Sequence, residues 1–307
     1  MSMNDSYKAF LSGKISKETY ISNQYENYHS KLFELSSYIK KTNIKKIEIV
    51  DDRVIFTTRS NGLRFICPEF DLRSSAIETL NFLDYEKDDS NMILNLINDG
   101  DTIFDIGANM GWYSILFNAL FRSSEIHSFE PVPNTYSIFI QNIELNNSIN
   151  IIHNNFGLSN DDKNQDIYFY PQGSGNASLQ NLSNSRDTIK IICKFKTLNQ
   201  YVNDNNCNLD FLKCDVEGAE LLVFKGGIET IKKFKPIVFS EILRKWSKGF
   251  GYDPNDIFDL FRSIGYEVFC CRDGKLSEFG IMDDKTIESN FFFLDPAKHL
   301  EKIKQYT

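Results

Sequence analysis

The spacing of apolar residues along the chain changes near residue 100. From there on, short apolar runs alternate with segments whose apolar residues recur at helical spacing. Such runs predict buried strands, and the segments between them predict amphipathic helices. The strands predicted in this way are 102–106, 125–129, 150–154, 209–214, 236–240, 265–270 and 291–294. This alternation indicates an α/β fold with a mostly parallel sheet that helices cover on both faces.

One stretch, at about residues 165–196, breaks this alternation. It holds two strand-like runs, 167–170 and 189–195, on either side of a polar loop at 173–187 that is rich in Gly, Ser and Asn. We therefore predict a β insertion with a flexible tip.

The first 98 residues are polar and follow a different pattern. Leu32, Leu35, Ser36 and Ile39 share one helical face. Residues 46–56 then alternate between apolar and polar side chains, which predicts a β-hairpin or meander that continues to residue 67. We expect an N-terminal helical and β-hairpin extension or cap over 1–98, and the α/β domain over 99–307.

The composition of the chain disfavours several classes of function. The chain has 307 residues and a formal net charge of -8, so nucleic acid is not an expected partner, because phosphate-backbone binding needs a basic surface. The six cysteines form no CxxC pair, and the four histidines are scattered, which disfavours a zinc site. No apolar run is long enough to span a membrane, and the first residues lack the pattern of a signal peptide. We expect a cytoplasmic protein.

A glycine-rich turn, residues 105–111, joins the strand at 102–106 to a predicted helix. Gly107 and Gly111 allow the backbone to turn tightly and to approach a ligand. Together with Asn109 they give the spacing Gly-x-Asn-x-Gly, which differs from the GxGxxG of pyrophosphate sites. Asp105 would also repel a pyrophosphate. An α-amino group or a sulfonium fits this turn better.

Further candidates follow the next two strands. Glu130, which precedes Pro131, comes 25 residues after Asp105. That is close to the spacing of about 20 at which an acidic residue reaches the ribose hydroxyls in doubly wound nucleotide sites. Asn155 and Phe156 follow the third strand, where a phenyl ring can stack on adenine and an amide can bond its amine. Surface or packing roles are the alternatives for these residues.

Four segments resemble the successive motifs of FkbM-type methyltransferases. They are 105–111, 129–131, 157–159 and 213–220. The resemblance covers about residues 100–245 and continues more weakly to about 295. It implies S-adenosylmethionine as the cofactor and the Rossmann-like class I methyltransferase fold, with seven strands of which the last is antiparallel. It also implies O-methylation of a hydroxyl, often on a sugar, glycan or secondary metabolite. Gly157 and Cys214 depart from the family pattern without removing a reactive group.

Three carboxylates follow the fourth and fifth strands: Asp215, Glu217 and Glu241. Ligands of open α/β sheets bind at this end of the strands. Methyl transfer to a hydroxyl requires an oriented acceptor and gains from a general base. We predict Asp215 as the first catalytic candidate and Glu241 as the second. Mg²⁺ held by this pair is a less favoured alternative, so no metal ligand is assigned. Glu217 can instead complement a helix dipole.

Other functions share parts of this pattern. An NAD-dependent Rossmann oxidoreductase would have the same fold but should carry GxGxxG, and a non-catalytic scaffold that binds S-adenosylmethionine would share the motifs. We favour a methyltransferase with a small-molecule or glycan acceptor. Residues 1–98 lie outside the resemblance, and we expect this cap to contribute to acceptor choice or to a homodimer.

Overall fold

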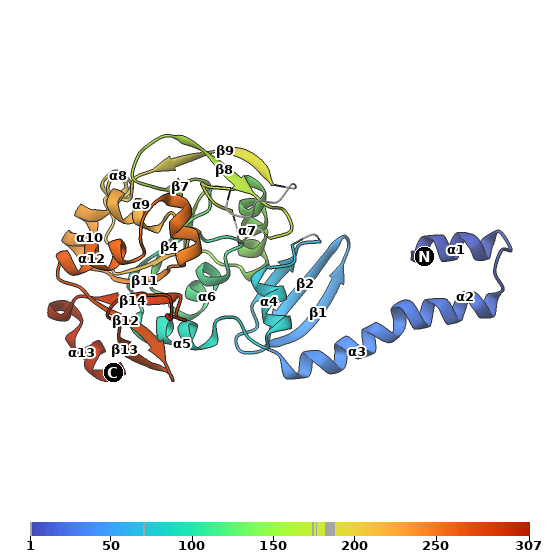
Figure 1. Cartoon of the computed structure of the whole chain (residues 1–307). Helices are drawn as coiled ribbons and strands as arrows, with labels where there is room; N and C mark the ends of the chain where they lie inside the picture. The colour runs from blue at the N-terminus through green and yellow to red at the C-terminus, as the bar shows by residue number, and fades with distance from the viewer. Residues whose placement is uncertain (1, 70, 174, 176, 182–187) are drawn as a thin grey trace.

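The computed structural model describes residues 2–69, 71–173, 175, 177–181 and 188–307. The loop predicted as a flexible tip includes positions 174, 176 and 182–187, which lie outside these residues. Figure 1 shows a rounded α/β body from which the N-terminal helices project. Within the described residues, no helix combines the length and the apolar character that crossing a bilayer requires.

An eight-stranded sheet forms the centre of the body, in the order β13-β12-β14-β11-β10-β4-β5-β6. Its strands are β4 (Thr102–Ile106), β5 (Glu125–Phe129), β6 (Ile151–Asn154), β10 (Phe211–Cys214), β11 (Ile237–Glu241), β12 (Glu267–Arg272), β13 (Lys275–Glu278) and β14 (Asn290–Leu294). Strands β6, β5, β4, β10 and β11 are parallel, whereas β14 runs antiparallel to both of its neighbours. The α/β, Rossmann-like class I methyltransferase fold is confirmed.

The sheet has one strand more than the seven that the resemblance implied. The chain reverses at Asp273 and Gly274, both with positive φ, and returns as β13 along the edge of β12. Paired positive φ angles are typical of tight hairpin turns, which explains the extra strand.

Helices cover both faces of this sheet, as predicted. Consecutive strand residues point to opposite faces: Ile103 and Phe211 belong to one hydrophobic cluster, Phe104 and Leu212 to the other. The first face is covered by α5 (Lys87–Leu96), α6 (Trp112–Leu120), α7 (Pro133–Asn146) and α13 (Pro296–Tyr306). The second is covered by α8 (Leu198–Asn205), α9 (Glu220–Gly226), α10 (Ile228–Phe234) and α12 (Asn255–Ser263).

The N-terminal part contains the predicted helices and a small antiparallel sheet. Its helices are α1 (Met3–Leu11), α2 (Lys17–Gln24), η1 (Tyr25–His29), α3 (Ser30–Tyr38) and η2 (Ile39–Lys41), which we call the arm, residues 3–41. The sheet that follows has the order β1-β2-β3, with β1 (Ile44–Val50), β2 (Arg53–Thr58) and β3 (Arg64–Cys67), and α4 (Ser75–Asn81) comes next.

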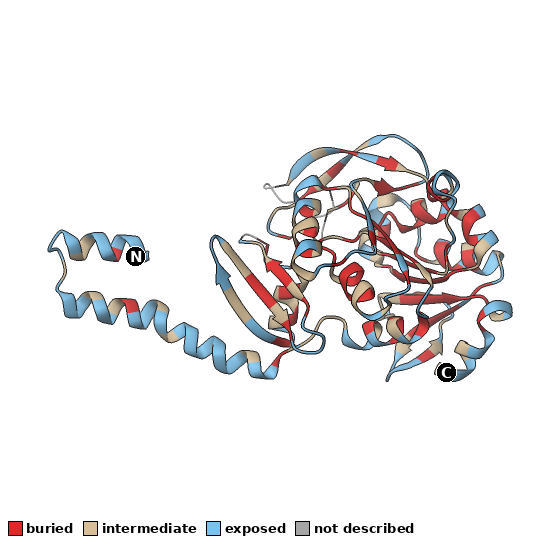
Figure 2. Ribbon diagram, turned by 180° about the vertical axis from the view of Figure 1, so that it is seen from behind, coloured by how far each residue is buried: buried red, intermediate tan, exposed pale blue. Residues whose placement is uncertain are grey.

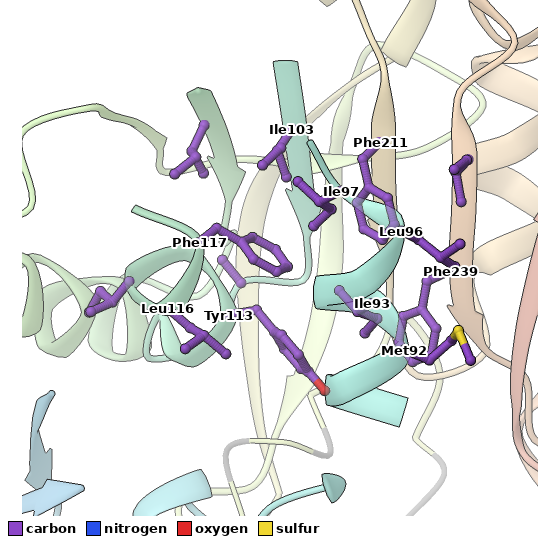
Figure 3. Close-up of a cluster of buried hydrophobic side chains, with 14 of the residues drawn as sticks. Met92, Ile93, Leu96, Ile97, Ile103, Tyr113, Leu116, Phe117, Phe211 and Phe239 are labelled. Atoms are coloured by element: carbon purple, nitrogen blue, oxygen red, sulfur yellow. The ribbon is translucent and has the colours of Figure 1, made fainter. Parts of the chain in front are cut away.

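Helix α5 joins the N-terminal part to the central sheet. Met92, Ile93 and Leu96 on this helix are buried against Phe211 and Phe239 of the sheet, as Figure 3 shows. The boundary predicted at residues 98/99 therefore crosses a hydrophobic core, because α5 supplies one of the layers that cover the sheet.

The stretch at 165–196 forms a β pair above the sheet. Strands β8 (Asn164–Phe169) and β9 (Ile189–Lys196) are antiparallel, and the short β7 (Gly157–Leu158) adds to β9 in parallel. Their apolar side chains pack with Val132 in a small third cluster. This arrangement places the insertion over the carboxyl ends of β4 and β5.

Candidate active site

A cavity of about 420 Å³ opens at the carboxyl ends of β4, β5, β10 and β11. Its walls come from six separate parts of the chain. They are the N-terminal segment 73–86, the loops after β4 and β5, the insertion, the loop after β10, and the segment 241–246. The site therefore lies where ligands of open α/β sheets bind, and it includes residues on both sides of position 98.

The glycine-rich turn after β4 forms one wall. Gly107 has φ +77°, and a Cβ atom there would lie 1.8 Å from the carbonyl oxygen of Asp215. Gly111 has φ +86°, and its Cβ would lie 2.1 Å from the ring of Phe139. Both positions require glycine, because the close approach leaves no room for a side chain.

Glu130 holds this turn against the end of β5. Its Oε2 accepts the backbone N–H of Asn109 at 3.0 Å, and its Oε1 accepts that of Val132 at 2.8 Å. Burial raises the pKa of Glu130 to about 7 despite these two bonds. Each carboxylate oxygen keeps a second acceptor position, and Glu130 lines the cavity.

A buried ion pair lies beneath the same turn. The Lys213 ammonium is 3.2 Å from Asp105 and 3.6 Å from Asp215, and it donates to the carbonyl of Gly107 at 3.2 Å. Burial acts to lower the pKa of Lys213, but the attraction of the two aspartates outweighs it, and the pKa lies above its usual range. Asp105 also accepts the hydroxyl of Ser114 at 2.6 Å.

The structure divides the predicted cofactor residues into two groups. Four of them line the cavity: Gly107, Asn109, Glu130 and Pro131. Four are not among the described lining residues: Asp105, Gly111, Asn155 and Phe156. Those four support the walls instead, since Asn155 donates to the carbonyl of Glu130 at 2.9 Å and Phe156 packs edge-on against Phe129. Direct contact between these four and a cofactor stays a prediction.

The structure brings together the three carboxylates after β10 and β11. One oxygen each from Asp215, Glu217 and Glu241 can be chosen so that all three lie within 4.8 Å of one another. Burial, followed by repulsion from Asp215, raises the pKa of Glu241 and that of Glu217 well above the usual range. The cluster therefore retains a proton at neutral pH, because like charges this close cannot all ionise.

Glu217, for which the sequence left a helix-dipole role as the alternative, lies three residues before the start of α9. It has φ +53° and lies before the helix, and its Oε2 is buried with no hydrogen-bond partner among the described residues. Glu220, the first residue of α9, holds the preceding loop, since its Oε1 accepts the N–H groups of Val216 and Gly218 at 3.2 and 3.0 Å. Glu217 is one of the residues that line the cavity.

Sequence reasoning missed a further carboxylate, Glu86. It lies in the N-terminal segment, has φ +43°, and accepts the hydroxyl of Tyr113 at 2.6 Å. Burial raises the pKa of Glu86 to about 7. Like Asp215 and Glu241, it lines the cavity. No local motif marks it, because the fold brings it to the site from a segment that the resemblance does not cover.

Aromatic rings complete the cavity wall. Tyr85 packs edge-on against Trp112 with 5.4 Å between ring centroids, and both line the cavity with Trp246. Trp246 belongs to a segment, residues 246–252, that also contains Phe250 and Tyr252. Tyr252 of the same segment bonds the carbonyl of Gly218 at 3.0 Å instead.

The fold and the position of this site are those of the Rossmann-like class I methyltransferases. The chain belongs to the FkbM methyltransferase family, because the family model "Methyltransferase FkbM domain" matches residues 105–268, just over half of the chain.

Two curated relatives are named as methyltransferases. The chain is 30% identical over 146 residues to "Methyltransferase 1" of Beauveria bassiana (strain ARSEF 2860), a match that covers 42% of this chain and 59% of the relative. It is 28% identical over 153 residues to "Methyltransferase sdnD" of Sordaria araneosa, covering 40% and 59%. The chain thus spans less than two thirds of the length of either relative.

Among solved structures, the chain is similar to methyltransferase FkbM from Methylobacillus flagellatus KT. The TM-score is 0.41 at 12% identity, and the match covers 88% of this chain and 60% of the other.

Proposed function

We propose that the protein transfers the methyl group of S-adenosylmethionine to a hydroxyl of a small-molecule or glycan acceptor. The observation that carries this proposal is the single cavity in which the FkbM-type turn and Glu130 face the carboxylates Asp215 and Glu241. A methyl donor at the turn and a hydroxyl at the carboxylates would meet within one enclosed space.

The turn and Glu130 would hold the cofactor. Glu130 accepts one backbone N–H on each oxygen and keeps acceptor positions for the two ribose hydroxyls. Gly107, Ala108 and Asn109 of the turn line the cavity, and they would surround the amino-acid end of the cofactor. Asp105 acts from below by holding Lys213 against the carbonyl of Gly107.

The acceptor hydroxyl would lie between Asp215 and Glu241. Asp215, which lies 3.6 Å from the Lys213 ammonium, would accept the proton as the new carbon–oxygen bond forms and the carbon–sulfur bond breaks. Glu241 keeps its proton at neutral pH because burial and Asp215 raise its pKa. It donates a hydrogen bond that orients the acceptor. The two carboxyl groups would thus have different tasks, because their environments differ.

The walls of this end favour a polyhydroxylated acceptor. Carboxyl groups accept hydrogen bonds from several hydroxyls, and the rings of Tyr85, Trp112 and Trp246 offer apolar faces for a sugar ring. This combination supports a sugar, a glycan or a hydroxylated secondary metabolite.

The deciding experiment measures cofactor binding and turnover with the full-length chain. Isothermal titration should show binding of S-adenosylmethionine and no comparable binding of NAD. A panel of sugars, glycans and hydroxylated metabolites, screened for S-adenosylhomocysteine formation, should then reveal an acceptor. Preferential NAD binding would favour an oxidoreductase. S-adenosylmethionine binding without turnover on any acceptor would favour a scaffold.

A further inference from the structure

The arm, residues 3–41, exposes more apolar surface than a helix in water should. Its exposed large apolar side chains include Leu11, Ile21, Tyr25, Leu32, Phe33 and Leu35. Phe33 is 67% exposed and Leu32 is 58% exposed. Figure 2 shows that the arm projects from the body with mostly exposed residues along its length. Leu32, Phe33 and Leu35 lie within four residues of helix α3, and exposed apolar side chains gathered in this way mark an interaction site.

The root of the arm is fixed, so the arm does not fold back onto its own body. The Arg59 guanidinium donates to the carbonyls of Ile39 and Ile44 at 3.1 Å and to that of Thr42 at 3.2 Å. The backbone N–H of Asn43 donates to the carbonyl of Leu83 at 2.6 Å. These bonds set the direction in which the arm leaves the small sheet. Its apolar surface must therefore be covered by another molecule.

Charge favours a second copy of this chain as that molecule. Residues 1–41 hold six lysines and four acidic residues, so they carry a net charge of +2. The whole chain carries −8, so residues 42–307 carry −10. The arm of one copy is thus electrostatically complementary to the body of another. A net charge of +2 spread over 41 residues is weak for an interfacial helix on an anionic membrane, which is usually rich in Lys and Arg on its polar face.

The size of the arm also suits a dimer. Helices α2, η1 and α3 form one continuous helical stretch over residues 17–38, which is about 33 Å long at 1.5 Å per residue. An exchange of two such arms between two bodies buries about 1,400 Å² in total, taking one face of each helix and the surface that receives it. That is within the range of roughly 1,200–2,000 Å² for stable interfaces.

We propose that the protein forms a homodimer in which the arm of each copy packs on residues 42–307 of the other. This inference does not depend on the proposed chemistry, because it uses no residue of the cavity. The symmetric exchange closes after two copies, since each arm is used once.

Sedimentation velocity of the full-length chain tests the proposal. The wild type should sediment as a dimer whose dissociation constant rises with added NaCl, because part of the attraction is between net charges. The triple variant Leu32→Ser, Phe33→Ser, Leu35→Ser should weaken the dimer by at least about 30-fold, the effect expected when central apolar anchors are truncated. The double variant Ser22→Ala, Ser37→Ala, changed at two exposed polar positions of the arm, should leave the dissociation constant unchanged.

Two further measurements distinguish loss of the dimer from loss of the fold. Circular dichroism and a thermal shift with S-adenosylhomocysteine should show that the triple variant keeps the fold of the body. Two differently tagged wild-type copies should co-purify, and the triple variant should not.

Four results would overturn the proposal. They are a wild type that stays monomeric up to about 100 µM, a triple variant with unchanged association, and equal weakening in the Ser22→Ala, Ser37→Ala variant. The fourth is a monomer that instead sediments with vesicles of phosphatidylserine and phosphatidylcholine.

Discussion

The two ends of the cavity are built in different ways. At the cofactor end, one strand–turn–helix unit and the end of the adjacent strand supply the wall, with Gly107 and Glu130 as the fixed points. At the acceptor end, carboxyl groups converge from places as far apart in the chain as Glu86, Asp215 and Glu241. The first end depends on local backbone geometry, and the second depends on the path of the whole chain.

This difference separates binding from chemistry in experiments. A change at the cofactor end should alter the affinity for S-adenosylmethionine and leave acceptor recognition intact. A change at the acceptor end should alter turnover or acceptor affinity and leave cofactor binding intact. The predictions below test this separation.

The largest effect should come from Asp215→Asn. It keeps the shape of the side chain but removes the charge that accepts the proton, so we expect kcat to fall by about 10²–10⁴-fold. Isothermal titration should show S-adenosylmethionine binding close to wild type, because Asp105 still pairs with Lys213 beneath the turn. Asp161→Asn, at an exposed loop position, is the control and should behave as wild type.

If both Asp215→Asn and Glu241→Gln kept full activity, the chemistry would lie elsewhere. The aromatic segment that contains Trp246 and the loop of the insertion would then be the next places to examine.

Glu130→Ala tests the cofactor end. Loss of charged hydrogen bonds to the ribose should weaken S-adenosylmethionine binding by about 1–3 kcal/mol, which is roughly 5- to 150-fold. The KM for the acceptor, measured at saturating cofactor, should change little. Wild-type affinity in this variant would refute the ribose assignment, and a change confined to the acceptor KM would contradict the separation of the two ends.

Glu86→Gln tests whether the N-terminal segment belongs to the acceptor end. We expect the acceptor KM to rise about tenfold, because a charge-assisted hydrogen bond becomes a neutral one. The affinity for S-adenosylmethionine should stay the same. Asp88→Asn, two residues further on and exposed, is the matched control. If the affinity for S-adenosylmethionine fell and the acceptor KM stayed the same, Glu86 would belong to the cofactor end of the cavity instead.

The same variant has a second, smaller consequence for stability. The pKa of Glu86 is about 7 in the folded chain, above its ordinary value of 4.5, because burial disfavours the charge. The stability that comes from protonated Glu86 is fully present below about pH 4.5 and is lost as the pH rises through 7. Glu86→Gln should therefore raise the free energy of unfolding by about 1 kcal/mol at pH 8 and by much less at pH 5. Urea denaturation at the two pH values measures this, and an equal effect at both would contradict the raised pKa.

The sequence predicted the parts of the molecule that depend on local pattern. Strands 102–106 and 125–129 have the predicted bounds, since their buried residues are contiguous. The sequence did not reveal Glu86 as a site residue, because only the packing of α5 brings it to Tyr113. It did not reveal strand β13 either, because Leu276 is the one buried residue of that strand. Helix α13 could have been predicted from its N-cap residue, because Asp295 accepts the N–H groups of Ala297 and Lys298.

Removal of metal ions should have the smallest effect. Asp215, Glu217 and Glu241 have oxygens close enough for one divalent cation, and the unpartnered Oε2 of Glu217 fits a ligand position. In our proposal, however, protons rather than a cation offset the repulsion among these groups, since burial and Asp215 raise the pKa of Glu241. We therefore expect EDTA to leave kcat unchanged at neutral pH. If EDTA abolished activity and Mg²⁺ restored it, the three carboxylates would be ligands of a hard cation, and Asp215 would no longer be free to act as the base. A Glu217→Gln variant would separate the two cases further, because a lost ligand would weaken Mg²⁺ binding, whereas a lost protonated carboxyl would leave turnover nearly unchanged.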